Sequence, residues 1–181
     1  MFKTGDLLIS EPFLPDPNFV RSVILLTEHG TGGSLGFVLN QLSDMTLEDL
    51  GDEFQNLDTP VYIGGPVEQN TLHFIHTVGD KIERSVKVND NLNWGGDLFE
   101  MLKLIRLGIV KNAQVRFFLG YSGWSKGQLK SELNANTWIQ ISDYKDELLD
   151  IPPATLWREV LKQKGGKLKA ISNYPIDPRL N

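Results

Sequence analysis

Apolar residues along the chain follow two spacings, which predicts a mixture of strands and helices. Short continuous apolar runs with many β-branched residues are typical of buried strands. The predicted strands cover residues 7–9, 23–27, 35–39, 61–63, 72–78, 82–88, 115–119 and 138–141. The glycine-rich stretch 29–34 separates two of these runs, and this predicts a β-hairpin.

Apolar residues three or four positions apart predict four helices. The first covers 47–57 and carries acidic residues on its other face. The second begins with Asp97 and Glu100, which resemble a capping box, and stops at Gly108. A short helix runs to about residue 133, a last helix lies between Pro152-Pro153 and Gly165-Gly166, and the tail 172–181 is expected to be irregular.

The order of these elements predicts an α/β (mixed α+β) fold with a mixed sheet. Strands joined by hairpins and interspersed with helices do not build a purely parallel sheet. A length of 181 residues suits one domain, and the sequence contains no repeat or linker. We therefore expect a single domain over 1–181.

Composition narrows the class of function. A net charge of -5 argues against broad nucleic-acid binding, which depends on Lys and Arg neutralising phosphates. The absence of cysteine excludes disulfides, thiol nucleophiles and Cys-ligated zinc. Acidic residues interrupt the apolar runs near the start, and no run is long enough to span a bilayer. We predict a cytoplasmic protein without membrane contact.

The sequence Gly120-Tyr121-Ser122-Gly123-Trp124 follows a predicted buried strand and precedes a helix. A glycine-punctuated turn at this place is where α/β proteins often carry a working site. A nucleophile elbow needs small residues two positions before and two after the serine, but Trp124 occupies the second of these positions. All three histidines also precede Ser122, opposite to the order in α/β-hydrolases. A tight turn over which Trp124 packs is the favoured interpretation.

Several ordered motifs resemble those of the YqgE/AlgH family over nearly the whole chain. They are Gly5–Ser10 with Pro12, Asp16, Phe19, Ser22–Leu26, His29, Gly36–Asn40, Gly64–Val67, Gly120–Trp124, Gly127–Leu129 and Glu132. The resemblance implies a three-layer arrangement in which a mixed, bifurcated sheet forms a pseudo-barrel flanked by helices. It implies no particular reaction, although some members are labelled transcriptional regulators. The family accepts Ala or Ser at the place of Ser122, which weakens a nucleophilic role.

Two histidine-containing segments suggest ligand sites. His29 and the glycines up to Gly36 can form a nest of backbone N–H groups for an anion, although a flexible hairpin is the favoured interpretation. The stretch lacks the Gly-Lys-Ser/Thr ending of a phosphate-binding loop. His73 and His76 could share a metal only on a helix, whereas the predicted strand sends them to opposite faces. We expect neither a metal nor a cofactor.

Charged clusters offer weaker evidence for partners. Six acidic residues lie between Asp44 and Asp58 with no Lys or Arg among them, as on a solvated helix face or against a basic partner. Four lysines between Lys162 and Lys169 suit the end of a helix, and nucleic-acid contact through them alone would be weak. We therefore expect a protein or small-molecule partner rather than nucleic acid.

The leading hypothesis is a non-enzymatic binding or regulatory protein that acts through its glycine-rich turns, with Trp124 as an exposed or half-exposed anchor. The alternatives are a hydrolase or transferase that uses Ser122 with His29 as base, and a binder of small anions at 29–36. The candidate binding residues are His29, Gly30, Gly32, Gly33, Asn40, Gly64, Gly65, Pro66, Gly120, Tyr121, Ser122, Gly123, Trp124 and Gln128.

Overall fold

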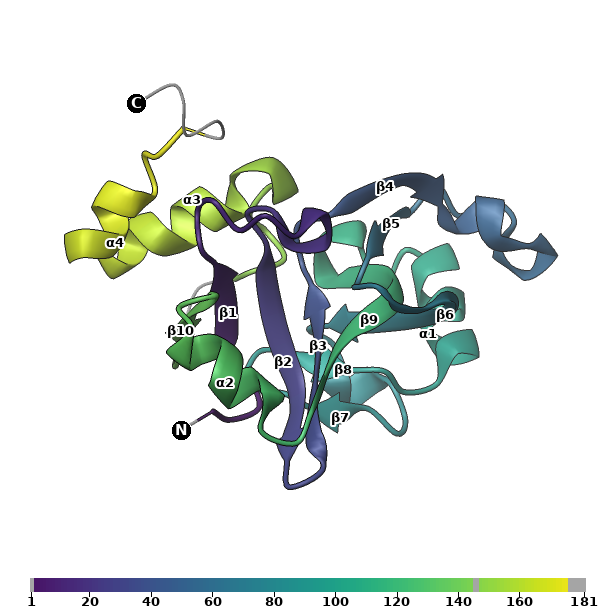
Figure 1. The fold of residues 1–181 in the computed structure, drawn as a ribbon. Coiled ribbons are helices and arrows are strands. Elements are labelled where there is room, and N and C mark those ends of the chain that lie inside the picture. Colours follow the sequence, from purple (N-terminus) through teal and green to yellow (C-terminus); the bar gives the residue numbers. More distant parts are fainter. Residues whose placement is uncertain (1, 145–146, 176–181) are drawn as a thin grey trace.

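The computed structural model describes residues 2–144 and 147–175. Its centre is a sheet of ten strands (Figure 1). The strands are β1 (Leu7–Ser10), β2 (Val23–Gly30), β3 (Gly33–Val38), β4 (Leu42–Thr46), β5 (Pro60–Ile63), β6 (Val67–His76), β7 (Val86–Lys87), β8 (Asn93–Trp94), β9 (Val115–Ser125) and β10 (Trp138–Ile141). The main path has the order β10-β1-β2-β3-β9-β6-β8-β7.

Strand β9 is the branch point of the sheet. Its first half pairs with β6 and, in parallel, with β5, whereas its second half pairs with β3. Strand β4 is added beside β5. The predicted mixed α+β class and the bifurcated sheet are therefore confirmed. The described strands do not close into a barrel, since the path ends at β10 on one side and at β7 on the other.

Within the described residues, four α-helices cover the sheet: α1 (Leu98–Arg106), α2 (Gln128–Asn134), α3 (Pro153–Lys164) and α4 (Gly166–Ile171). Figure 1 shows α3 and α4 beside β1, whereas α1 lies beside β6. Alternate residues of β1 and β2 point to opposite faces of the sheet and pack in two different hydrophobic cores. Leu7 and Leu25 pack with α3, whereas Leu8 and Ile24 pack with α2. A third core joins α1 to the first half of β9. No helix in the described ranges is long and apolar enough to cross a membrane.

Most of the predicted elements are confirmed. The hairpin is formed by β2 and β3, and α3 begins after Pro152 as expected. At the start of α1, Asp97 caps the helix by accepting from the backbone N–H of Glu100. Glu100 does not complete a capping box with Asp97, because its carboxylate accepts from the backbone N–H of Glu83 instead. Gly165 ends α3, but the chain turns into α4 before the tail.

Two predicted elements are wrong. The helix expected over 47–57 is two 3-10 helices, Leu47–Leu50 and Asp52–Phe54. Gly51 separates them with φ of 154°, a conformation that no helix contains. The strand expected over 82–88 is reduced to Val86–Lys87, because Arg84 has φ of 62°, outside the extended region. Among the described strands, β8 is the one that pairs with it. Part of the predicted tail, residues 176–181, lies outside the described residues.

Candidate functional site

The stretch Gly120–Trp124 is part of strand β9 and not the predicted turn. Ser122 pairs with Gly36 and Trp124 with Ser34, so β3 continues the sheet along this stretch. The true turn follows at Lys126-Gly127, just before α2. Glycine and serine suggested a turn, but here the pairing with a neighbouring strand determines the conformation.

Gly120 shifts the alternation of side chains along β9 by one residue. Phe118 and Tyr121 both contact the core under α3, although residues three apart in a regular strand point to opposite faces. Gly120 has φ of 67°, which favours glycine. An added Cβ would lie 2.6 Å from the carbonyl oxygen of Val67. A glycine is therefore required at the branch point of the sheet.

Gly64 and Gly65 lie directly against β9. The carbonyl oxygen of Gly64 accepts from the backbone N–H of Val38 at 2.9 Å and from Oγ of Ser122 at 3.1 Å. A Cβ on Gly64 would lie 2.3 Å from the carbonyl oxygen of Gly120. This close approach of backbones joins β3, β5 and β9 and leaves no room for a ligand.

The structure does not assemble a nucleophilic site at Ser122. Its side chain is 1% exposed and its hydroxyl donates to a backbone carbonyl. His29 lies on β2, two strands away from β9, a separation of roughly 9–10 Å. His29 is also level with Ser34 and Trp124 rather than with Ser122. The pairing of Ser122 with His29 as base is therefore wrong for this conformation.

Trp124 is also not the exposed anchor that the sequence suggested. It is 6% exposed, beneath α2. Its Nε1 donates to Oε2 of Glu132 at 2.8 Å, and Nε1 of Trp138 donates to the same oxygen at 2.7 Å. Gln128 donates to the other oxygen of Glu132. One carboxylate thus accepts from both indole N–H groups, and this allows Trp124 to lie inside the fold rather than at the surface.

Other predicted residues have structural contacts. Asn40 accepts from the backbone N–H of Val23 and donates to the carbonyl of Arg21. His73 and His76 lie on β6 and face opposite sides as predicted, since His73 contacts the ring of Phe37 and His76 that of Phe74. Burial lowers the pKa of both imidazoles. Within the described residues, no group of three or more His, Asp or Glu is arranged to hold a metal ion.

The hairpin glycines lie apart from the contact between Gly64 and Gly120. Gly30 and Gly32 have no atom within 4 Å of an added Cβ, and Figure 1 shows the hairpin tip projecting past the other strands. The three glycine-rich segments therefore come together only in part. Gly64, Gly65 and Gly120 meet, and Pro66 and Gly123 flank them, whereas the hairpin tip is separate.

A pocket of about 450 Å³ lies between the hairpin and α2; we call it the hairpin pocket. Nδ1 of His29 and Oγ of Ser34 are hydrogen-bonded at 2.7 Å, and the ring of Phe2 packs edge-on against His29. Helix α2 contributes apolar side chains and a lysine. The lining residues include Phe2, His29, Gly30, Gly33, Ser34, Ser125, Leu129, Lys130, Leu133 and Gln140.

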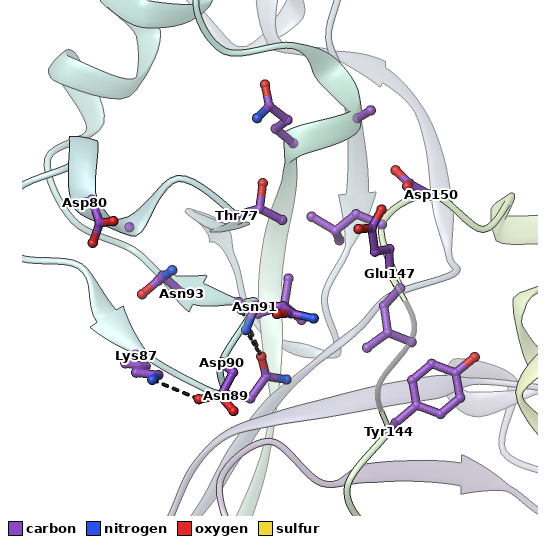
Figure 2. A pocket seen from close by; sticks show the side chains of 16 residues that line it. Thr77, Asp80, Lys87, Asn89, Asp90, Asn91, Asn93, Tyr144, Glu147 and Asp150 are labelled. Carbon is purple, nitrogen blue, oxygen red and sulfur yellow. Dashed lines mark hydrogen bonds and ion pairs between the residues drawn. The ribbon is translucent and has the colours of Figure 1, made fainter.

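A second pocket, of about 570 Å³, lies between the β7–β8 turn and the segment before α3 (Figure 2). We call it the asparagine pocket, because Asn89, Asn91 and Asn93 line one side. Glu147 and Asp150 line the other side. Sequence reasoning missed it, although Asn89-Asp90-Asn91 before an Asn93-Trp94 pair was a visible polar cluster.

The family model described as AlgH-like matches residues 7–169. The chain belongs to the AlgH-like family. It is 41% identical to a UPF0301 protein of Cytophaga hutchinsonii over 182 residues, covering 100% of both chains. It is 38% identical to a UPF0301 protein of Chlorobaculum tepidum, covering 100% of this chain and 97% of that one.

Two solved structures have the same AlgH-like fold. The solution structure of AlgH from Pseudomonas aeruginosa matches with a TM-score of 0.72 and 26% identity, covering 95% of this chain and 94% of that chain. A crystal structure of a Corynebacterium diphtheriae protein matches with a TM-score of 0.78 and 20% identity, covering 96% and 93%. The family resemblance seen in the sequence motifs is thus confirmed, and these names state no reaction.

Proposed function

We propose that this AlgH-like protein is a non-enzymatic binding module whose hairpin pocket takes a small amphipathic anion. The observation that carries the proposal is the pocket itself, which brings the predicted residues His29, Gly30 and Gly33 beside helix α2. A pocket of about 450 Å³ is in the range that holds small organic ligands.

The apolar part of the ligand has a defined surface to contact. Phe2, Leu129 and Leu133 line the pocket together, and Leu129 also belongs to the core beneath α2. An aliphatic chain of moderate length would bury its surface against these side chains, at roughly 25 cal/mol per Å². This wall favours a ligand with a hydrocarbon body over a purely polar ion.

The polar part of the pocket favours a negative head group. Lys130 supplies a cation whose ammonium group can only donate. The Ser34 hydroxyl is hydrogen-bonded to Nδ1 of His29, and the Ser125 hydroxyl donates to Oε1 of Gln128. Among the described residues that line this pocket, none carries a carboxylate. A carboxylate or phosphate head would therefore meet the Lys130 ammonium group without like-charge repulsion.

Octanoate is a suitable probe, with octanol and octylammonium as neutral and cationic analogues of the same chain. We expect octanoate to bind at least about tenfold more tightly than octylammonium, because one favourable charge contact contributes about 1–2 kcal/mol. Amide shifts in NMR spectra should cluster at 29–34 and 125–134. Equal binding of both charged probes would contradict the proposed anion preference.

Matched variants separate binding from chemistry. Lys130→Ala should weaken octanoate binding about tenfold, whereas Lys103→Ala on α1 removes an exposed lysine elsewhere and should leave it unchanged. Ser122→Ala should bind octanoate like the wild type, and a fluorophosphonate should not label Ser122, because that hydroxyl is buried. Stoichiometric labelling of Ser122 would support the hydrolase alternative instead.

We also propose that the protein acts as one domain in the cytoplasm on a small-molecule or protein partner rather than on nucleic acid. The lack of cysteine and the net charge of -5 support this assignment.

A further inference from the structure

The asparagine pocket differs in chemistry from the hairpin pocket. Its side chains come from separate segments: Thr77 follows β6, Asp80 lies in a 3-10 turn, Asn89 and Asn91 lie in the β7–β8 turn, and Glu147 precedes α3. Figure 2 shows the asparagines facing Glu147 and Asp150 across the opening. Polar groups thus converge on a shared space of about 570 Å³.

The charges of this pocket exclude an anionic ligand. Four carboxylates line it, from Asp80, Asp90, Glu147 and Asp150, against one lysine, Lys87. Lys87 is already paired with Asp90 at 3.0 Å. The carboxyl groups of Glu147 and Asp150 are hydrogen-bonded to each other, and this raises the pKa of Glu147. A carboxylate or phosphate would be repelled here.

Two amide side chains provide donors with a fixed orientation. Oδ1 of Asn89 accepts from the backbone N–H groups of Asn91 at 2.9 Å and Leu92 at 2.8 Å. Oε1 of Gln114 accepts from the backbone N–H of Lys111 at 3.2 Å. Because both oxygens bind N–H groups, each amide must present its NH₂ group as a donor elsewhere. Figure 2 shows the Asn89 nitrogen on the side away from its turn.

The pocket therefore offers amide donors beside carboxylate acceptors. An ammonium group can only donate, so it would satisfy the carboxylates and leave the amide donors unused. A hydroxyl group both donates and accepts, so adjacent hydroxyl groups can accept from the amides and donate to the carboxylates. Tyr144 adds an aromatic ring to the lining, which can pack against the C–H groups of a sugar ring.

We propose that the asparagine pocket binds a small polyhydroxylated ligand without negative charge, a neutral sugar or an amino sugar. This site is independent of the hairpin pocket, since the two share no lining residue among those described. Its occupancy can therefore be tested separately from the proposed function.

The test is calorimetric titration of the full chain with D-glucose, D-glucosamine and D-glucuronate, which share the same pyranose ring. We expect glucose or glucosamine to bind at least about tenfold more tightly than glucuronate, because only glucuronate brings a carboxylate toward the acidic wall. The proposal is overturned if neither sugar binds at about 100 mM. It is also overturned if glucuronate binds equally, or if putrescine or calcium binds while both sugars fail.

Two nearly isosteric substitutions make the test specific to the amide donors. Asn89→Asp and Gln114→Glu keep the oxygen that binds the backbone N–H groups but replace the NH₂ donor with a charged oxygen. Each should weaken sugar binding about tenfold without lowering the melting temperature appreciably. Gln163→Glu makes the same change at an exposed position of α3 and is the matched control. Sugar binding that is equal in Asn89→Asp, Gln114→Glu and Gln163→Glu would also overturn the proposal.

Discussion

The glycines of the branch point and those of the hairpin tip have opposite surroundings. A Cβ on Gly64 would lie 2.3 Å from a carbonyl oxygen and one on Gly120 2.6 Å from another, whereas Gly30 and Gly32 have no atom within 4 Å of that position. In the first region glycine allows three strands to approach one another. In the second it leaves an open hairpin beside a pocket. The same residue type thus marks packing in one region and access in the other.

This difference separates the packed stretch Gly120–Trp124 from the hairpin pocket that we propose as the binding site. Gly120–Trp124 is occupied by contacts within the chain: Ser122 binds the Gly64 carbonyl and Trp124 binds Glu132. The hairpin residue His29 lies instead on the surface beside a cavity. A motif that resembles a working site in the sequence can therefore be a requirement of the fold.

The largest expected effect is that of Gly64→Ala. The added Cβ meets backbone atoms of β9 that cannot move independently, so we expect a loss of about 3 kcal/mol or more in the free energy of unfolding. Urea denaturation measures this value. Gly32→Ala is the matched control and should change stability by less than about 0.5 kcal/mol. Similar losses in both variants would remove the distinction between the two regions.

Glu132→Ala tests whether the tryptophans belong to the packed region. The substitution removes the acceptor of two buried indole N–H groups, and we expect a loss of about 2–4 kcal/mol in urea denaturation. Glu159→Ala also removes a helical glutamate, but one in a partly exposed ion pair with Lys162, and should cost less than about 1 kcal/mol. If Glu132→Ala cost no more than its control, Trp124 could not be considered fixed by this contact.

Acid should destabilise the protein through the half-buried His73 and the buried His76, with a smaller effect. Burial lowers the pKa of His73 and His76 below the ordinary value of 6.5. The unfolded chain therefore binds more protons once the pH falls below 6.5. The stability contributed by these groups is complete above that pH and declines as the pH falls toward the folded pKa values.

The measurement is the urea midpoint between about pH 5 and pH 8. His76→Gln should flatten the decline, because His76 is fully buried and donates from Nε2 to the carbonyl of Gly95. His29→Gln on the exposed hairpin is the control and should leave the decline in place. A midpoint in His76→Gln that falls with acid as steeply as in the wild type would exclude His76 as the source.

The sequence was sufficient for elements whose pattern is local. The runs at 23–27 and 35–39 predicted the hairpin, and the capping residue Asp97 located the start of α1. It was insufficient where a distant residue determines the conformation or the burial. Pairing with β3 holds Gly120–Trp124 as a strand, and the hydrogen bond to Glu132 allows Trp124 to be buried. The asparagine pocket was out of reach for the same reason, because residues 89–93 and 147–150 meet only in the fold.

The shift at Gly120 has a consequence for how the molecule unfolds. Strand β9 contributes side chains to all three cores, some before Gly120 and some after it. Each half of the sheet therefore needs β9 to complete its packing. We expect the hairpin side and the α1 side to lose structure together, in one cooperative transition, and not as separable units. For the same reason, cutting the chain within β9 should yield two fragments that do not fold alone.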